Sequence, residues 1–253
     1  MNLLEVENLS VSFYRPEGEI EAVKNVSFSL GEGEILAVMG ETGCGKSVLC
    51  KSILKLLPDI AKIKTGRIVV RGEEITDYTE KQMRKLRGSF FSMVFQNPMT
   101  ALNPCMSVGE QIVEAVRLRQ PGLSGRERKQ RAEELMYRVG FDHPRERAKQ
   151  YPFQLSGGMA QRGVIAIALA AQPSVLFADE ATTALDVTVQ AQILDLFLEL
   201  RKTMGMSIVL VTHNPGVAAG AADRVALMKD GELTGIGDVE EIFEEIIHKH
   251  NFI

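Results

Sequence analysis

The residues with the clearest chemical potential are the glycine-rich stretch Gly40–Ser47, which has the sequence GETGCGKS. It fits the pattern G-x-x-x-x-G-K-[ST], in which backbone N–H groups surround the phosphates of a nucleotide. Glycine permits turns with positive φ and a close approach of the backbone to an anion. In this pattern Lys46 reaches the β- and γ-phosphates and Ser47 binds Mg²⁺. The expected binding residues are Gly40, Glu41, Thr42, Gly43, Cys44, Gly45, Lys46, Ser47 and Val48.

The neighbours of this loop favour a nucleotide site over the alternative of a glycine-rich turn without a ligand. Residues 34–39 form an apolar run of strand length, and residues 47–54 place apolar side chains at helical spacing. Strand, loop and helix therefore follow one another in the order that the pattern requires. The positive N-terminal end of the helix would add to the attraction for phosphate.

Four more polar residues follow apolar runs of strand length: Gln96, Asp179, Glu180 and His213. In open α/β sheets, ligands bind beyond the carboxyl ends of the strands. We expect Asp179 to anchor Mg²⁺ through its water shell, and Glu180 to accept a proton from the water that attacks the γ-phosphate. Gln96 would position that water or complete the Mg²⁺ shell, and His213 would hydrogen-bond the γ-phosphate. Each residue alone is more often structural, but their order behind the phosphate loop favours nucleotide hydrolysis.

The elements that must position these residues alternate along the chain. Apolar runs of strand length alternate with helical patterns, which predicts an α/β fold with a mostly parallel sheet and an antiparallel N-terminal part. Asp230-Gly231 has the composition of a tight hairpin turn. The expected strands cover residues 3–13, 22–30, 34–39, 67–70, 73–75, 90–95, 174–178, 207–212, 224–228 and 232–234, and the clearest helices cover 47–54, 161–172 and 190–204.

Residues 107–150 are charged and helical in pattern, with little strand signal. Ser124 and Glu127 fit a capping box at the start of a helix. We predict a single domain over 1–253, in which residues 97–150 form a helical subdomain inserted between core segments 1–96 and 151–253. The basic runs within 107–150 are interleaved with acidic residues, so we interpret them as solvated helix faces rather than contacts to nucleic acid.

The bulk properties exclude several classes of protein. The chain has 253 residues, of which 45% are hydrophobic and 25% charged, with a formal net charge of −4. This charge gives no general attraction to nucleic acid. The sequence has no apolar run long enough to span a membrane and no pattern of a signal peptide. Its three cysteines form no CxxC pair or disulfide framework, which predicts reduced thiols and a cytoplasmic location.

Residues 155–159, LSGGM, resemble the signature of ABC-type ATPases. The resemblance extends over almost the whole chain, because it includes the phosphate loop, Gln96, residues 175–180, residues 184–186 and His213. It implies a RecA-like core that binds ATP, and two such domains packed head to tail around two ATP molecules. Ser156, Gly157 and Gly158 would contact the γ-phosphate bound by the opposite subunit, and Asp186 would lie at the interface. Phe13 aligns best with the aromatic that stacks on adenine, with Tyr14 as the alternative.

Three longer stretches, 95–104, 151–159 and 182–192, look like those of the peptide/nickel importer ATPases, in particular the D-type subunit. This resemblance implies a second ATPase subunit, either an F-type partner or a second copy, together with two membrane permeases and an external solute-binding protein. It places the chain at the cytoplasmic face of the membrane. Residues 97–104 and the helical subdomain would receive the coupling helices of the permeases. Peptide and nickel or metallophore remain alternative solutes.

The chain departs from the family pattern at three points. Ala181 stands where Pro usually follows the catalytic Glu, and Asn214 replaces the common Asp after His213. The sequence ends at Ile253, without the cysteine-containing C-terminal extension usual in peptide importers, which favours a short nickel-type member or a truncated chain. Two other functions are weighed against an importer: an ABC ATPase that acts on DNA or ribosomes, and a regulatory subunit with weak activity. The absence of tandem cassettes, coiled-coil inserts or zinc modules argues against the first, and the intact hydrolysis residues argue against the second.

Overall fold

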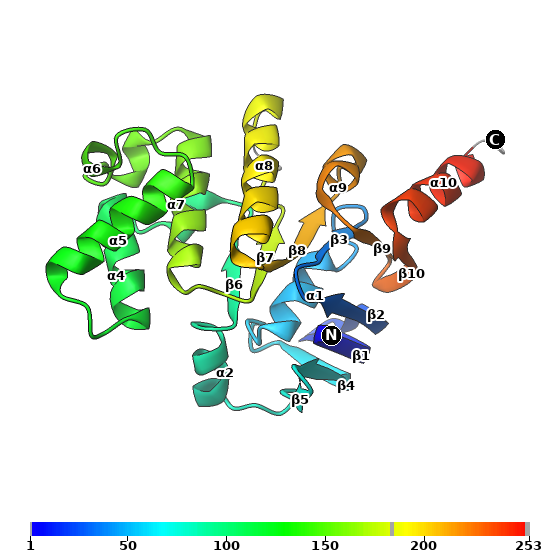
Figure 1. The fold of residues 1–253 in the computed structure, drawn as a ribbon. Coiled ribbons are helices and arrows are strands. Elements are labelled where there is room, and N and C mark those ends of the chain that lie inside the picture. The colour runs from blue at the N-terminus through cyan, green and yellow to red at the C-terminus, as the bar shows by residue number, and fades with distance from the viewer. Residues whose placement is uncertain (1, 183–184, 251–253) are drawn as a thin grey trace. The chain divides into compact units, whose positions relative to one another are not determined.

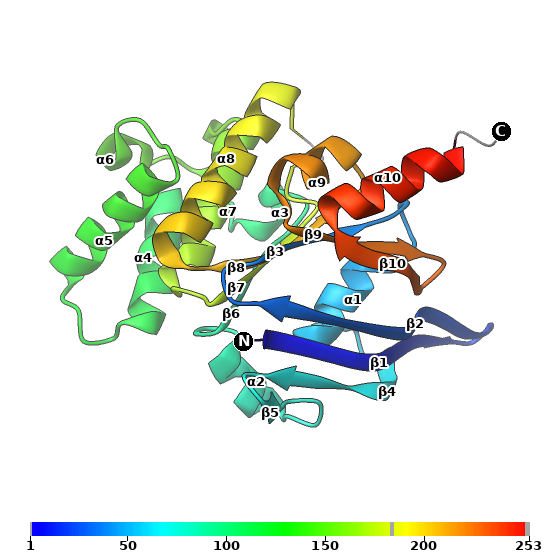
Figure 2. The ribbon, with the colours of Figure 1, turned by 45° about the vertical axis from the view of Figure 1, so that its right-hand side comes forward.

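The computed structural model describes residues 2–182 and 185–250, without the side chains of 246–250. The chain forms two compact units (Figures 1 and 2). The first comprises the described residues up to Arg84 together with those from Leu200 onward. The second comprises Lys85–Glu199.

An antiparallel sheet forms the N-terminal part of the first unit. Its strands are β1 (Asn2–Arg15), β2 (Gly18–Gly31), β4 (Ala61–Val70) and β5 (Glu73–Glu74), in the order β2-β1-β4-β5. Strand β4 begins six residues before the predicted start at Arg67, because it pairs with β1 from Ala61 onward, opposite Phe13. Gly66 allows this pairing, since a Cβ atom there would lie 2.5 Å from Cα of Leu9. The predicted antiparallel N-terminal part is therefore confirmed.

Parallel strands carry the phosphate loop in the same unit. Strand β3 (Ile35–Met39) pairs in parallel with β8 (Ser207–Thr212) on one side and β9 (Arg224–Lys229) on the other. All residues of β3 and β8 are buried, as expected for strands covered on both faces. Strand β10 (Glu232–Asp238) is antiparallel to β9. The helices of this part are α1 (Lys46–Ile53), α9 (Pro215–Ala221) and α10 (Val239–His250).

The turn between β9 and β10 is the hairpin predicted at Asp230-Gly231. Asp230 has φ 49° and Gly231 has φ 89°, and two consecutive residues with positive φ are what a type I′ turn requires. The turn between β4 and β5 has the same character, with φ 49° at Arg71 and 81° at Gly72. These two turns are therefore two-residue hairpin connections with matching backbone conformations.

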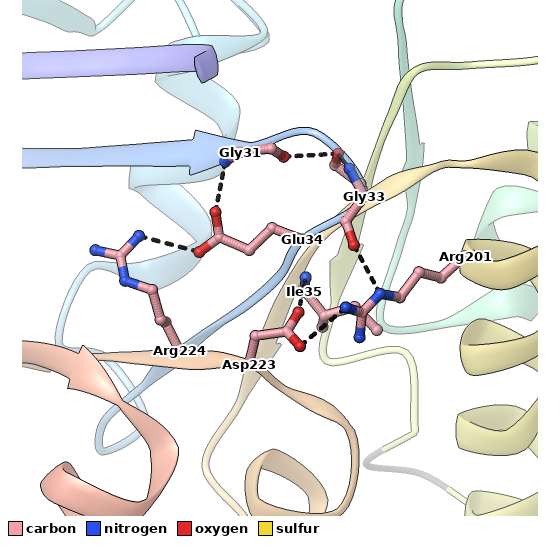
Figure 3. A network of polar contacts seen from close by, with 8 residues as sticks. Gly31, Gly33, Glu34, Ile35, Arg201, Asp223 and Arg224 are labelled. Carbon is pink, nitrogen blue, oxygen red and sulfur yellow. Dashed lines mark hydrogen bonds and ion pairs between the residues drawn. The ribbon is translucent and has the colours of Figure 1, made fainter. Parts of the chain in front are cut away.

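A polar network fixes the turn from β2 to β3 (Figure 3). Asp223 accepts a hydrogen bond from the buried N–H of Ile35 at 2.8 Å and forms an ion pair with Arg201 at 2.9 Å. Arg201 also donates to the carbonyl of Gly33 at 2.6 Å. Next to them, Glu34 accepts from the N–H of Gly31 and pairs with the guanidinium of Arg224 at 3.0 Å. These contacts provide hydrogen-bond partners for backbone groups at the turn where the chain enters strand β3.

The second unit combines two parallel strands with several helices. Strand β6 (Phe91–Val94) pairs with β7 (Val175–Asp179). Helices α4, α5 and α7 pack against one another. Of these, α4 and α5 fall within residues 107–150 and confirm the helical character predicted there. The helices are α3 (Pro98–Ala101), α4 (Val108–Arg119), α5 (Gly125–Arg138), α6 (Pro144–Arg147) and α7 (Gly157–Ala170), with a 3₁₀ turn at Pro152–Gln154. Helices α2 (Glu80–Leu86) and α8 (Val187–Met204) each run across a unit boundary.

Two helices of this region begin earlier than the sequence predicted. Helix α7 starts at Gly157 rather than at 161, because Ser156 caps it and the two glycines belong to its first turn. Helix α8 starts at Val187 rather than at 190, because the side chain of Asp186 accepts a hydrogen bond from the N–H of Val189. In both cases a polar side chain replaces the missing helical partners of the first N–H groups.

In the part of the chain that the structure describes, no helix combines the length and the apolar character needed to cross a lipid bilayer.

Candidate functional site

The phosphate loop leads from β3 into α1 within the first unit. Gly45 immediately precedes α1 with φ 107°, and a Cβ atom there would lie 2.3 Å from the carbonyl oxygen of Ala22. Only glycine fits such a position. Helix α1 has no side-chain cap and no acidic residue in its first turn. The partial positive charge of its N-terminal N–H groups is therefore offered to an external anion, which fits a bound phosphate.

Lys46 brings a full positive charge to this loop. Its side chain is buried, with 3% of its surface exposed, and its ammonium donates to the carbonyls of Gly40 at 2.8 Å and Glu41 at 2.7 Å. Carbonyl oxygens at both positions hold the cation inside the curve of the loop. A point charge held there is what the stabilisation of phosphate oxygens needs.

The register of β3 and β8 brings His213 next to the phosphate loop. Met39 of β3 is opposite Thr212 of β8, so Gly40 and His213 are the first residues beyond two adjacent strand ends. The side chain of His213 is exposed. The sequence prediction that these two positions lie at the same sheet edge is confirmed.

Asn214 has a clear local role that the sequence left unassigned. Its side-chain oxygen accepts from the N–H of Gly216 at 2.9 Å and so caps α9, and its own N–H donates to the hydroxyl of Thr212 at 3.0 Å. An aspartate could accept the same capping bond. Asn214 therefore holds the backbone that carries His213 in place.

Phe13 and Tyr14 are the two candidates for stacking on adenine. Phe13 is partly exposed, and Tyr14 is 44% exposed. Successive side chains of a strand point to opposite faces, so one face of β1 can present only one of these rings. The choice of Phe13 stays a prediction.

The second unit joins Gln96 to Glu180. Val94 of β6 is opposite Ala178 of β7, and two residues further along each chain segment the Nε2 atom of Gln96 donates to Oε2 of Glu180 at 2.8 Å. Asp179 and Glu180 are buried, with 5% and 8% of their surfaces exposed. Glu180 has φ 49°, which is uncommon for a residue other than glycine. The carboxylate is thus held in a fixed place at the strand end, and Ala181 behind it is also buried.

The residues of the signature segment lie at the start of α7. The hydroxyl of Ser156 accepts from the N–H of Met159 at 3.3 Å, and Ser156 and Gly157 are exposed. Gly158 packs against α8, because a Cβ atom there would lie 2.6 Å from Cγ1 of Val189. The exposed start of α7 can therefore approach an anion carried by another molecule.

Asp186 is exposed and caps α8 through Val189. This capping role is one that the sequence reasoning missed, although an Asp just before a helical pattern is a recognised start signal. Residues 183 and 184 of the same motif lie outside the described residues.

The predicted site residues thus fall into two groups, one on each unit. Phe13, the loop Gly40–Val48 and His213 lie on the first unit. Gln96, Ser156–Gly158, Asp179, Glu180 and Asp186 lie on the second. The first group offers a basic, N–H-rich cradle for phosphate. The second offers carboxylates and an amide suited to a metal and to proton transfer.

Comparison with known proteins gives a consistent result. Residues 23–183 match the family described as "ABC transporter". The chain is 48% identical to the dipeptide transport ATP-binding protein DppD of Bacillus subtilis, over 98% of this chain and 74% of that protein. It is 47% identical to the oligopeptide transport ATP-binding protein OppD of Bacillus subtilis, over 99% of this chain and 70% of that protein.

A solved structure extends the likeness to three dimensions. A dimeric ATP-binding cassette in a post-hydrolysis state, bound to ADP and Pi, superposes with a TM-score of 0.84 at 31% sequence identity. The alignment covers 93% of this chain and 98% of that cassette. The predicted fold class is therefore confirmed. The chain belongs to the ABC transporter family, as one of its ATP-binding, ATP-hydrolysing proteins.

Proposed function

We propose that this chain is the ATP-hydrolysing subunit of an importer for peptides, in which ATP binding closes a pair of nucleotide-binding domains and hydrolysis reopens it. The observation that carries the proposal is the 48% identity to a dipeptide transport ATP-binding protein over 98% of this chain. The oligopeptide protein at 47% identity supports the same class of solute. Both relatives are named as transporters of peptides, so peptide is the solute to test first.

The phosphate loop is proposed to hold the β- and γ-phosphates of ATP. Backbone N–H groups at Gly43 and Gly45 and at the start of α1 would bind phosphate oxygens. The ammonium of Lys46, already held by two carbonyls, would face the γ-phosphate. Phe13 would stack on the adenine.

Ser47, Gln96 and Asp179 would hold Mg²⁺, since hydroxyl, amide and carboxylate oxygens are the ligands it prefers, directly or through water. The ion would neutralise negative charge on the phosphate oxygens when bound. Glu180 would accept the proton of the attacking water, and its bond from Gln96 keeps the carboxylate in place for that step. His213 would hydrogen-bond the γ-phosphate from the neighbouring strand end.

The complete site is proposed to need two subunits. Ser156, Gly157 and Gly158 are available at the exposed start of α7, and we infer that they cover the γ-phosphate of a partner subunit while Asp186 lines the interface. A dimeric cassette bound to ADP and Pi is the supporting comparison. An isolated subunit should bind ATP but hydrolyse it slowly, so the turnover per subunit should rise with protein concentration. Equal turnover per subunit from dilute monomer to assembled complex would contradict this requirement.

The remaining partners follow from the importer proposal. Two permeases would carry the solute, residues 97–104 and the helical subdomain 97–150 would receive their coupling helices, and an external binding protein would deliver the peptide. The chain, as a single nucleotide-binding domain, would sit peripherally at the cytoplasmic face of the membrane. The homodimer and the heterodimer with an F-type subunit are both compatible with this arrangement.

The decisive experiment is to purify the tagged chain from its own cells and identify what binds to it. We expect two permeases, and we expect peptide-loaded binding protein to stimulate ATP hydrolysis by the reconstituted complex. Stimulation by a nickel-loaded binding protein instead would identify nickel, rather than peptide, as the transported solute. Recovery of ribosomes or DNA without permeases would overturn the importer proposal.

A further inference from the structure

The hairpin turn between β9 and β10 packs directly on the phosphate loop. The N–H of Gly231 donates to the carbonyl of Cys44 at 3.1 Å, although the two residues are far apart in the sequence. The carbonyl of Gly231 in turn accepts from the N–H of Lys24 on β2 at 2.8 Å. The turn therefore links the phosphate loop to β2 through the N–H and the carbonyl of Gly231.

Steric contacts reinforce these hydrogen bonds. A Cβ atom at Gly40 would lie 2.1 Å from the carbonyl oxygen of Met228, the last buried residue before the turn. A Cβ atom at Gly45 would lie 2.8 Å from the Met228 side chain and 2.3 Å from the carbonyl oxygen of Ala22. Both ends of the loop are thus in close contact with β9 or β2, with no space for a side chain.

The bond from Gly231 has a directional consequence for phosphate binding. In a planar trans peptide, the carbonyl of one residue and the N–H of the next point in opposite directions. Because the Cys44 carbonyl is held toward Gly231, the N–H of Gly45 must point away from the hairpin, so a phosphate bound on that side of the loop could accept a hydrogen bond from it. The hairpin therefore determines the direction of one donor of the anion site.

We propose that the Asp230-Gly231 turn is a positioning element for ATP binding, which holds the phosphate loop in its anion-binding conformation through the Gly231–Cys44 hydrogen bond. Gly231 acts through the loop and does not touch the nucleotide. This inference rests on the proposed role of Gly40–Ser47 as the phosphate-binding loop.

A substitution at Gly231 could disturb the phosphate loop without changing any residue of the loop itself. A Cβ atom at Gly231 would lie 3.1 Å from the carbonyl oxygen of Ala22, the same atom that a Cβ at Gly45 would meet at 2.3 Å. Gly231→Ala would push on this carbonyl and so displace Gly45. The turn at Gly72 offers a matched control, because it has φ 81° and a Cβ atom there would have no neighbour within 4 Å among the described residues. Gly72→Ala carries the same backbone strain but makes no contact with the loop.

The test is to measure equilibrium binding of ATP, ADP and AMP to the full chain for Gly231→Ala, Gly72→Ala and the unchanged protein, below the unfolding temperature of each. We expect Gly231→Ala to weaken the binding of ATP and ADP by about 10-fold or more, since small misplacements of a binding group are costly. AMP, which lacks the β- and γ-phosphates, should bind to all three proteins alike. Gly72→Ala should lower the unfolding temperature but leave ATP binding unchanged. A purely structural role of Gly231 predicts equal ATP affinity in both variants, which would overturn the inference.

Two further variants complete the design. Asparagine tolerates the left-handed conformation, so Asp230→Asn should retain the affinity for ATP. Valine does not tolerate it, so Asp230→Val should weaken ATP binding as Gly231→Ala does. If Gly231→Ala does not fold, the two variants of the exposed residue Asp230 provide the test instead. Equal ATP affinity of Asp230→Asn and Asp230→Val would contradict the proposal. Lys46→Ala distinguishes a failure of the proposed phosphate site from a failure of the proposed role of the hairpin. If Lys46→Ala binds ATP as tightly as the unchanged protein, the proposed phosphate site is wrong. If Lys46→Ala loses affinity while Gly231→Ala keeps it, only the role of the hairpin is wrong.

Discussion

Gln96 and Glu180 lie at matching positions beyond two adjacent parallel strands, and the amide of one donates to the carboxylate of the other at 2.8 Å. The carboxylate also sits on a backbone with φ 49°, so its position is set both by the chain and by the amide. A group held in this way needs little rearrangement to accept a proton from water.

The first prediction concerns proton transfer at this carboxylate. Glu180→Gln should retain ATP binding but reduce hydrolysis by about 100-fold or more, because an amide cannot accept the proton that a general base removes. Phosphate release and nucleotide binding by the assembled complex measure the two effects separately. Hydrolysis at the unchanged rate would exclude Glu180 as the base.

Mg²⁺ dependence tests the neighbouring carboxylate. Chelation of Mg²⁺ should abolish hydrolysis, and Asp179→Asn should raise the Mg²⁺ concentration needed for half-maximal turnover by about 10- to 100-fold, as loss of an outer-shell partner does elsewhere. Asp223→Asn is a suitable control, because that carboxylate supports the β2–β3 turn instead. Identical Mg²⁺ titrations of the Asp179 variant and the unchanged protein would remove Asp179 from the metal site.

The two signature glycines should respond differently to substitution. Gly158→Ala should destabilise the fold by about 1–3 kcal/mol, because its Cβ would overlap with Val189. At Gly157 the nearest atom would be 3.7 Å away, on Leu185, so alanine should be neutral or stabilising by up to about 1 kcal/mol. Urea unfolding of both variants measures the difference. Equal unfolding midpoints would show that the contact between α7 and α8 relaxes freely.

The polar network at the β2–β3 turn should contribute more to stability than an exposed ion pair. Asp223→Ala removes the acceptor for the buried N–H of Ile35, at a cost of about 1–3 kcal/mol. Breaking the exposed pair between Arg145 and Glu133 by Glu133→Ala should cost about 0–1 kcal/mol. The comparison uses denaturant unfolding of each variant against the unchanged chain. A smaller loss for Asp223→Ala than for Glu133→Ala would contradict this account of the network.

Two capping boxes predict a pH dependence of stability. Glu110 accepts from the N–H and hydroxyl of Ser107, and these hydrogen bonds lower the pKa of Glu110 below its ordinary value of 4.5. The hydroxyl and the N–H of Ser124 lower the pKa of Glu127 in the same way. Because the folded-state pKa is lowered, each contribution is complete above the ordinary pKa and is lost as the pH falls through the lowered one.

A double variant isolates this effect. Glutamine can still accept the capping hydrogen bond but does not titrate. Glu110→Gln combined with Glu127→Gln should therefore flatten the fall of the unfolding temperature between about pH 5 and pH 3, a range set by the ordinary glutamate pKa. An acid profile as steep as that of the unchanged chain would show that other carboxylates control it.

Local sequence signals predicted some elements well and others poorly. Strand β8 matches its predicted range 207–212, because an apolar run buried on both faces has a clear boundary at each end. The length of strand β4 was underestimated, because Lys62 and Lys64 are exposed residues whose strand conformation depends on pairing with β1, which is distant in the sequence. The starts of α7 and α8 were placed too late, because glycines and a capping aspartate obscured the first turns.

The candidate site shows a similar division. The positions of Gly40 and His213 beyond adjacent strands followed from the alternation of strands and helices. The contact of Gly231 with Cys44 could not be predicted, because a turn motif specifies its own backbone but not the distant segment on which it packs. The left-handed backbone of Glu180 was also unexpected, since glutamate has no preference for it.

The capping bonds on either side of His213 limit how this residue can respond to phosphate. The amide of Asn214 is tied back to Thr212 and its side chain is tied forward to Gly216, so the backbone that carries the imidazole is fixed from both directions. Movement of the imidazole relative to β8 is therefore rotation about its own side-chain bonds. Such rotations are far faster than loop rearrangements. In a nucleotide titration followed by NMR, the ring signals of His213 should shift while the amide signals of the α9 cap stay largely in place.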